Sequence, residues 1–271
     1  MEFENQHVIP HGYLKAWACP TAPPGKKGCL WVIQKNDPDD KKLRSPKKHF
    51  SQKDRYTVNT GNVRVLNVEK ALNVIETDFG KVRQLLDARR PLTQEHRVAL
   101  VFFAAAMMTR VESYPERVGG MLKRIQQQAA RQAARHGLES TLSKGIETSL
   151  ARVSAESVST GMPETAALLW RMKLSIFVTD DEAGFITSDN PCCLCVPRDW
   201  HPYLAHPDAE LTFALTPYHL AFFSWKTPAL LYRKAGRKMV DEANSRTIAW
   251  SRKEFVSKTG VVRQEWLPAT S

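Results

Sequence analysis

The sequence predicts an α+β fold in which strands from both ends of the chain pack with a central helical segment. Two observations predict it: the hydrophobic pattern takes a helical period near residue 67 and returns to β-branched and aromatic runs after residue 174. Strands before and after a run of helices indicate α+β rather than alternating βαβ units. We expect a single domain over residues 1–271, with a helical middle at about 67–173 and a β-rich part at about 174–235. The N- and C-terminal strands are expected to share one antiparallel or mixed sheet.

The first third of the chain combines a short helix with strands. Pro10 suits the start of a helix, and Tyr13, Leu14 and Trp17 then fall on one helical face. Residues 20–28 predict a loop, and β-branched and aromatic content predicts strands at 29–34 and 55–58. The Pro, Asp and Lys residues of 36–48 predict an exposed, mobile excursion between these strands.

The middle of the chain predicts five helices. Apolar residues recur every three or four positions from Val68 to Leu86, with Asn67 as a plausible N-cap. Thr93 caps a second helix that is apolar nearly all round, so we expect it to be the central buried helix. A third helix is predicted from Pro115 to His136, and two shorter ones lie within 139–157 and at 164–173.

The last third predicts mainly strands. Residues 175–179 and 185–187 flank a five-residue turn and predict a β-hairpin. Further strands are expected within 211–225 and at 229–232. A last helix near 240–252 precedes a short strand-like tail.

The charge balance favours a polyanionic partner. The net charge is +11 and the pI is near 9.5, which suits nucleic acid, a nucleotide or an acidic protein surface. The alternative is a charge excess that serves only solubility. Four arginines of the third predicted helix lie along one line, with no Asp or Glu between residues 117 and 136. We take these four as substrate-binding candidates: Arg117, Arg124, Arg131 and Arg135. The alternative is that they form a solvated helix face.

Composition also bears on the compartment. No run approaches the ~18–20 apolar residues of a membrane span, and residues 1–20 lack a basic start and an apolar segment typical of a secretory signal. Five cysteines, an odd number, favour reduced thiols in the cytoplasm. We therefore expect a cytoplasmic protein with no membrane partner. Cys192, Cys193 and Cys195 are more typical of buried core thiols than of metal ligands.

Two polar segments stand out as a candidate site. Asn5, His7 and Tyr13 open the chain, and residues 188–190 follow a predicted strand. Pro191 pushes the residue before it out of helical geometry, so the strand should end with Asp189 at its tip. The alternative is a turn in which Asp189 only accepts backbone N–H bonds. The substrate-binding candidates of this site are Asn5, Tyr13, Ser188 and Asn190.

These motifs resemble a widespread, largely bacterial family of uncharacterised domains. The resemblance rests on the opening Asn-x-His-x-x-Pro-x-x-Tyr-Leu-x-x-Trp, on Ile75-Glu76, on an Arg that closes the next helix, and on Thr-Ser-Asp-Asn-Pro at 187–191. It extends from Asn5 to the helix that contains Asn244. Family members tend to have Pro soon after the Arg, whereas four residues separate Arg110 from Pro115 here. The resemblance implies a site but no reaction, with these recurrent polar positions: His7, Glu76, Arg110, Ser188, Asp189 and Asn190.

This residue set is chemically sufficient for phosphodiester hydrolysis. His7 would act as a general base or ligand, Asp189 and Glu76 as ligands or orienting groups, and Arg110 as a clamp on a phosphate oxygen. A divalent metal is possible, and no cofactor is defined. Glu69 lies on the same face as Glu76 but about 10 Å away along the helix, so we expect it to be a solvated flank residue.

We therefore predict a hydrolase of the phosphodiesterase or nuclease type that acts on nucleic acid or nucleotide. The alternative is a non-catalytic basic domain that recognises nucleic acid or a protein partner. The sequence contains no phosphate-binding Gly-rich loop, no G-x-S-x-G and no H-E-x-x-H, which disfavours the common nucleotide-driven, serine hydrolase and zinc protease classes. Oligomeric state is not set by any of these patterns.

Overall fold

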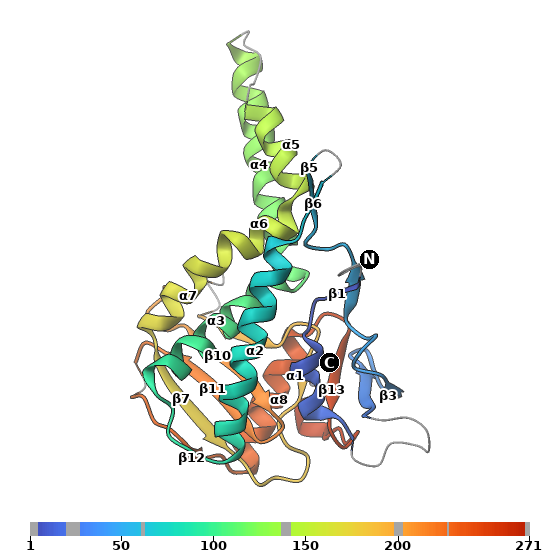
Figure 1. The fold of residues 1–271 in the computed structure, drawn as a ribbon, viewed down its shortest axis with the longest axis vertical. Helices are drawn as coiled ribbons and strands as arrows, with labels where there is room; N and C mark the ends of the chain where they lie inside the picture. The colour runs from blue at the N-terminus through green and yellow to red at the C-terminus, as the bar shows by residue number, and fades with distance from the viewer. Residues whose placement is uncertain are drawn as a thin grey trace.

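The computed structural model of this chain describes residues 5–19, 28–60, 63–136, 142–197, 203–226 and 228–268. It confirms the α+β fold, with sheets that are antiparallel except for one parallel pair, β12 with β7, packed against a helical middle (Figure 1). A four-stranded sheet has the order β3-β2-β13-β8, and a five-stranded sheet has the order β12-β7-β11-β10-β9. Two short ribbons pair β1 with β4 and β5 with β6.

The four-stranded sheet joins the two ends of the chain, as the sequence predicts. β2 (Leu30–Gln34) lies antiparallel to β13 (Glu254–Ser257), with Ile33 opposite Phe255. β13 also pairs with β8 (Thr187–Ser188), the strand that carries the Thr-Ser-Asp-Asn-Pro turn. This sheet therefore fixes the position of residues 188–190 relative to the C-terminal segment.

The expected excursion at 36–48 is instead mostly a strand. β3 (Asp37–Arg44) pairs antiparallel with β2, with Val32 opposite Lys42. Charged residues do not prevent strand formation at the edge of a sheet, where they protect the open edge from pairing with another chain. The predicted strand at 55–58 is also shifted, because β4 covers Ser51–Lys53 and β5 covers Val58–Thr60. β6 follows at Val63–Val65.

The predicted hairpin at 175–187 is wrong. β7 (Lys173–Val178) pairs with β11 and β12 in the five-stranded sheet, whereas β8 pairs with β13 in the other sheet. Residues 179–186 cross between the sheets, and the Phe185 amide donates to the Pro217 carbonyl at 2.7 Å. Gly184 has φ +64°, and a Cβ there would lie 2.6 Å from that carbonyl oxygen, so the crossing requires glycine.

In the rest of the five-stranded sheet, β10 and β11 agree with the strands predicted within 211–225, β12 lies just after the predicted 229–232, and β9 was not predicted. β9 covers Cys192–Cys195, β10 Glu210–Thr216, β11 His219–Ser224 and β12 Arg233–Lys234. Side chains of β10 alternate between two helical layers: Phe213 contacts Phe103 of α3, whereas Thr212 lines a groove together with residues of α8 (Arg237–Trp250). The sheet thus lies between α3 and α8.

α3 (Gln94–Arg110) is the central buried helix, as predicted. Thr93 caps it: its hydroxyl accepts the His96 amide at 3.4 Å, and the Thr93 amide donates to the His96 ring at 3.2 Å. Phe103 stacks on Phe79 of α2 (Asn67–Asp87) with ring centroids 3.8 Å apart. The main hydrophobic core extends from Val8 to Val256, so segments from the whole described chain contribute to it.

The remaining helices include one feature that leaves the body of the protein. α4 (Ser113–Arg135) begins two residues before the predicted Pro115, and α4 and α5 (Leu142–Ala151) project together from the rest of the fold (Figure 1). α6 (Val153–Ser159) and α7 (Gly161–Arg171) lead back to β7. A short α1 (His11–Leu14) continues into a 3-10 turn at Lys15–Trp17.

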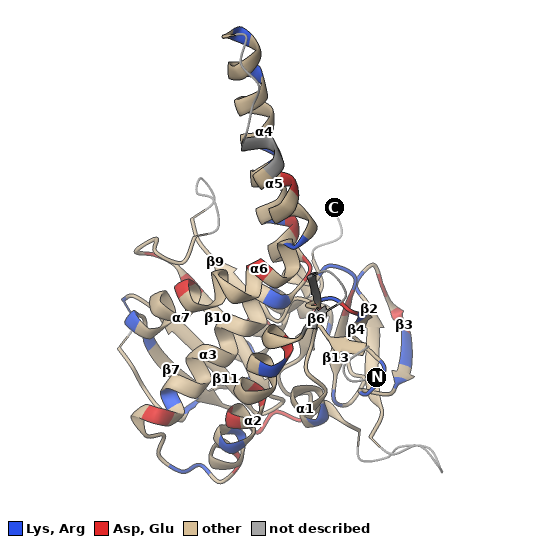
Figure 2. Cartoon of the chain, turned by 45° about the horizontal axis from the view of Figure 1, so that its top comes forward, with Lys and Arg blue, Asp and Glu red and all other residues tan. Residues whose placement is uncertain are grey.

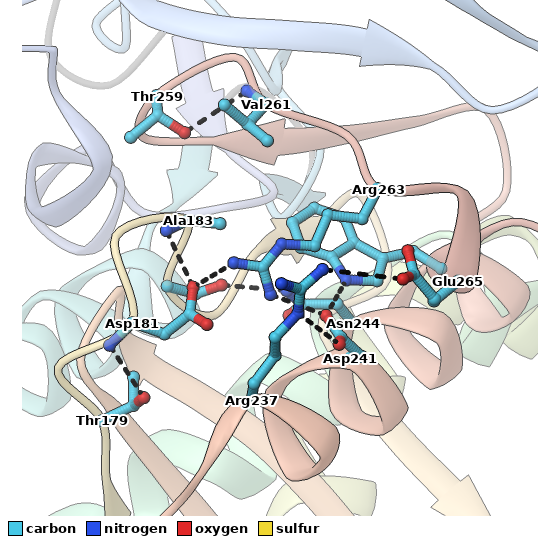
Figure 3. A network of polar contacts seen from close by, with 12 residues as sticks. Thr179, Asp181, Ala183, Arg237, Asp241, Asn244, Thr259, Val261, Arg263 and Glu265 are labelled. Atoms are coloured by element: carbon cyan, nitrogen blue, oxygen red, sulfur yellow. Dashed lines mark hydrogen bonds and ion pairs between the residues drawn. The ribbon is translucent and has the colours of Figure 1, made fainter.

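A polar network anchors the C-terminal segment to the body (Figure 3). Arg263 contacts Asp181 at 2.5 Å and Asp241 at 2.8 Å, and both carboxylates are largely buried. Asp241 also accepts from the indole of Trp266 at 2.6 Å, in the 3-10 turn Gln264–Trp266. Neighbouring Asn244 of α8 holds the sheet crossing, because it accepts the Ile186 amide and donates to the Gly184 carbonyl. These contacts are structural, and they close the fold around β13.

Candidate functional site

Two histidines lie side by side at the start of the chain. β1 (Asn5–His7) and α1 place the His7 and His11 rings 6.1 Å apart with an angle of 29° between their planes. One nitrogen of His7, Nε2, donates to the Lys47 carbonyl at 3.0 Å. Partial burial and the nearby Lys15, His7 and Lys47 side chains lower the pKa of His11, and Glu76 opposes them. His11 is therefore a neutral imidazole near pH 7, beside a second imidazole.

Glu76 and Arg110 form an ion pair beneath this pair of histidines. Arg110 ends α3 and is 1% exposed, and its guanidinium contacts Glu76 of α2 at 2.7 Å. Another guanidinium nitrogen donates to the His7 carbonyl, and the Tyr56 hydroxyl donates to the Arg110 carbonyl at 3.1 Å. Burial lowers the pKa of Arg110, but Glu76 and Tyr56 outweigh it and raise the pKa overall. Arg110 thus holds the His7 backbone in place, and its burial leaves it little access to a phosphate.

Glu69 joins the same polar group, contrary to the expectation of a solvated residue. It is 8% exposed, and one of its carboxyl oxygens, Oε2, has no hydrogen-bond partner in the structure. Burial raises the pKa of Glu69, Arg110 opposes that shift, and Glu76 adds to it. The seven-residue spacing placed both glutamates on one face of α2, but that face points into the protein rather than into water.

Asp189 makes its contacts elsewhere. Its carboxylate accepts the backbone N–H groups of Arg252 at 2.8 Å, Lys253 at 2.7 Å and Glu254 at 3.3 Å. Burial raises the pKa of Asp189, against the effect of these three donors. These contacts match the alternative in which Asp189 accepts backbone N–H bonds. The donors, however, come from the segment after α8 and not from its own turn. Among the described residues, no contact joins Asp189 to His7, and a catalytic role for Asp189 stays a prediction.

The other residues of the two motifs differ in how accessible they are. Tyr13 is 1% exposed, and its hydroxyl donates to the Ala214 carbonyl at 2.6 Å and lies 2.7 Å from the Thr187 hydroxyl. Ser188 is fully buried, and its hydroxyl accepts a hydrogen bond from the backbone N–H of Asn190 at 3.1 Å. Asn5 is exposed and pairs with Lys53 between β1 and β4. Tyr13 and Ser188 thus lie in the core, where they support the neighbouring segments and do not reach solvent.

Asn190 lines a pocket of about 340 Å³, which we call the Asn190 pocket. Ser113 and Arg117 of α4 contribute one wall, and the pocket continues toward the C-terminal end of α8. The complete lining is Met108, Ser113, Arg117, Asn190, Cys192, Leu194, Ala249, Trp250 and Arg252. Two predicted binding residues, Asn190 and Arg117, therefore lie in one cavity. Ser113, Trp250 and Arg252 were not predicted, because no local pattern marks them.

The arginine line predicted on the third helix lies on the outer face of α4. Arg117, Arg124, Arg131 and Arg135 are all exposed, and Figure 2 shows basic residues along this projecting helix. The opposite side of α4, with Leu122 and Ala129 half-buried, packs toward α5. Within the described part of the chain, Arg124, Arg131 and Arg135 have no ion pair, which leaves their charge available to a ligand.

A comparison with protein families identifies the chain. A family described as "Protein of unknown function (DUF4238)" matches residues 5–260, which includes both polar motifs and the helical middle. The chain belongs to the DUF4238 family. No curated protein and no solved structure gives a significant match.

Two of the three clustered cysteines of this DUF4238 protein lie in the core, as predicted, and Cys195 is half-buried. Cys192 and Cys193 are buried free thiols. Burial raises the pKa of Cys193 to about 12 and raises that of Cys192 well above its ordinary value. Both stay protonated near neutral pH, which disfavours their use as metal ligands or nucleophiles.

Two further findings concern metal-binding clusters and membrane-spanning helices in the described part of this DUF4238 chain. The described residues contain no cluster of three or more His, Cys, Asp or Glu side chains placed to hold a metal ion. No helix of the described segments combines the length and the apolar run that crossing a membrane requires.

Proposed function

We propose that this chain binds nucleic acid along the arginine face of α4. The observation that carries the proposal is a row of exposed arginines, without ion pairs among the described residues, on a helix that projects from the body of the protein. Arginine is well suited to phosphate, because its planar guanidinium donates in a fork and keeps its charge at any physiological pH. The net charge of +11 adds a favourable long-range attraction.

The dimensions of the face fit several phosphates. Arg117 and Arg135 are 18 positions apart, which corresponds to about 27 Å along a helix. Met121, one turn after Arg117, is 49% exposed, so an apolar contact is available beside the cationic ones. Glutamines at 128 and 132 add neutral hydrogen-bond donors there. An extended strand or one side of a duplex could follow this surface.

The test measures binding of labelled single-stranded and duplex DNA and RNA by fluorescence anisotropy at several salt concentrations. We compare wild type with the triple variant Arg124→Gln, Arg131→Gln, Arg135→Gln. Loss of three phosphate contacts should make the slope of log affinity against log salt shallower by about 2–3 and weaken binding by about tenfold or more at low salt.

A charge-matched control separates the face from the net charge. Lys42→Gln, Arg44→Gln, Lys48→Gln removes the same charge from β3 and the turn after it, at exposed positions. It should change the affinity by less than about twofold, since net charge acts only at long range. Equal weakening by both triple variants would show that net charge, and not α4, determines binding, and it would overturn the proposal.

A phosphodiester hydrolase is a second candidate, favoured by the His7–His11 pair beside Glu76. Hydrolysis needs one group to take a proton from the attacking water and one to give a proton to the leaving oxygen, and two adjacent imidazoles can share these tasks. Lys15 and Lys47 lie near enough to affect His11 and would attract a phosphate. Glu76 and Arg110 would position this pair rather than contact substrate.

The hydrolase candidate is tested on the same oligonucleotides by following cleavage with and without divalent metal. His7→Ala and His11→Ala should each lower the rate by a factor of about 100 or more. Asp189→Asn should retain the rate, because its carboxylate serves the backbone of residues 252–254. Cleavage that survives both histidine substitutions would remove the histidine pair as the site. Loss of cleavage in a folded Asp189→Asn protein would restore Asp189 as a catalytic candidate.

A further inference from the structure

The Asn190 pocket lies at the body end of the arginine face of α4. Arg117 belongs to both: it is the first arginine of the face and one of the residues that line the pocket. A strand whose phosphates follow the arginines toward the body would therefore arrive at this cavity. Its volume of about 340 Å³ is in the range of small-ligand pockets.

Part of the pocket lining is apolar. Leu194 and Cys192 are buried, and Met108 and Trp250 are half-buried. An indole stacks on nucleobases of any kind, and a thioether makes favourable contacts with aromatic rings. These groups suit a planar ring better than a sugar or a phosphate.

The Asn190 side chain adds a polar edge with unused capacity. Its Oδ1 accepts one bond, from the Ser113 hydroxyl at 3.3 Å, and its Nδ2 donates one, to the Trp250 carbonyl at 3.0 Å. A primary amide can donate two hydrogen bonds and its oxygen can accept two, so one donor and one acceptor are left. When an asparagine amide has one free donor and one free acceptor, it can pair with the N6 and N7 edge of adenine. The two existing bonds fix the amide plane.

The two arginines that line the pocket differ in whether nearby carboxylates compensate their charge. Arg252 contacts Glu116 at 2.8 Å and Glu112 at 3.3 Å, so its charge is largely compensated. Arg117 has no ion pair among the described residues, and its guanidinium lies 5.2 Å from the centre of the Tyr114 ring. Arg117 is therefore the cation that can meet a phosphate at the pocket entrance.

We propose that the Asn190 pocket binds one unpaired adenine base of a single strand whose phosphates lie along α4. The inference rests on the proposed nucleic-acid binding and adds a base preference to it. The base enters between the Trp250 and Met108 side chains, its amino edge meets the Asn190 amide, and Arg117 contacts the adjoining phosphate. A base inside a duplex is stacked and paired, so the pocket reads only single strands or loops.

The experiment compares strands that carry the same charge. The probes are a labelled thymidine 12-mer, the same strand with one central deoxyadenosine, and the same strand with one central abasic site. Wild type should bind the deoxyadenosine strand at least about fivefold more tightly than either of the other two, since a well-placed base contact discriminates by about this much. Annealing the deoxyadenosine strand to its complement should remove the preference.

Two variants test the pocket itself. Ala249→Phe places a ring in the cavity at an exposed position, so it should abolish the preference without unfolding the protein, while the matched Ala205→Phe, outside the pocket lining, should leave it intact. Asn190→Asp removes the amide donor and should abolish the adenine preference as well, since a carboxylate accepts from the cytosine amino group instead. Thermal unfolding of each variant confirms that the fold is retained.

The outcomes separate the two proposals. Equal binding of the three strands by wild type overturns the base pocket, and if the α4 triple variant still weakens binding, the proposed function stands without it. Binding that ignores the α4 arginines overturns the proposed function instead. A preference that persists in Ala249→Phe shows that the base is read elsewhere and overturns the pocket.

Discussion

Glu69 is a single buried carboxyl group whose protonation should affect the stability of the whole chain. It lies beside Arg110 and Glu76, and burial raises its pKa above the ordinary value of 4.5. The folded state therefore holds its proton to higher pH than the unfolded state does. The associated stability is complete below the unfolded pKa and is lost as pH rises through the raised folded pKa.

We predict that Glu69→Gln removes this pH dependence. The amide keeps the shape and cannot ionise, so the variant should equal or exceed wild type in free energy of unfolding at pH 7. At pH 4 it should show no advantage. Urea unfolding at several pH values measures this, with exposed Glu182→Gln as the matched control. A variant that is less stable than wild type at pH 7, but not at pH 4, would show that the ionised carboxylate stabilises the fold through Arg110.

At this same scale, the sequence predicted some of the residues that contact one another at the candidate site. The motif resemblance placed Glu76 and Arg110 with His7, and the structure joins these three through Arg110. His11, four residues after His7, was missed because its importance depends on Lys15, Lys47 and Glu76 nearby. For Asp189 the sequence offered backbone hydrogen bonding as an alternative, but it could not identify the three donors, since they lie more than 60 residues away at a helix end.

Among the secondary structure elements, α4 contains an internal weak point. Gly119 and Gly120 lie in its interior, where glycine costs about 0.5–1 kcal/mol relative to alanine. A Cβ at Gly120 would meet nothing within 4 Å. The helix therefore gives up stability at this point without a steric reason, close to where it leaves the body of the protein.

We predict that Gly120→Ala stabilises α4 by about 0.5–1 kcal/mol, because it restricts the unfolded chain without a clash. Hydrogen exchange of the backbone amides of residues 121–135 should slow by about two- to fivefold, in line with that free energy. Gly184→Ala is the contrasting variant and should destabilise, given its φ of +64° and the close Pro217 carbonyl. Faster exchange in Gly120→Ala would show that the glycine is needed for the packing of α4.

Elements were predicted well where the pattern is local. The helix of α3 follows from its cap and apolar run, and the pairing of terminal strands follows from their composition and position. The crossing between β7 and β8 was missed because a turn of five residues with a glycine is typical of a hairpin. Its partner strands are decided by β11 and β13, which come later in the chain. Likewise, only pairing with β2 turns the charged segment of β3 into a strand.

At the scale of the whole molecule, the C-terminal segment closes the fold. β13 lies between β2 and β8, and the main core takes residues from both ends of the chain and from the helices. Trp266 is fully buried and belongs to a second core cluster with Ile33, Ile248 and Phe255. Loosening this segment should therefore weaken the N-terminal strands and the α8 layer together.

We predict that Trp266→Ala lowers the free energy of unfolding by about 3–5 kcal/mol, because it leaves a large cavity and removes the indole donor to Asp241. Trp266→Phe retains most of the packing and loses only that bond, so its cost should be about 1–2 kcal/mol. Urea unfolding followed by far-UV circular dichroism and by tryptophan fluorescence should give coincident transitions in wild type, and both should shift together in each variant. If Trp266→Ala instead separated the two transitions, with the helical signal unchanged in midpoint, the helical middle and the C-terminal sheet would be independent folding units, and the prediction of one domain would fail.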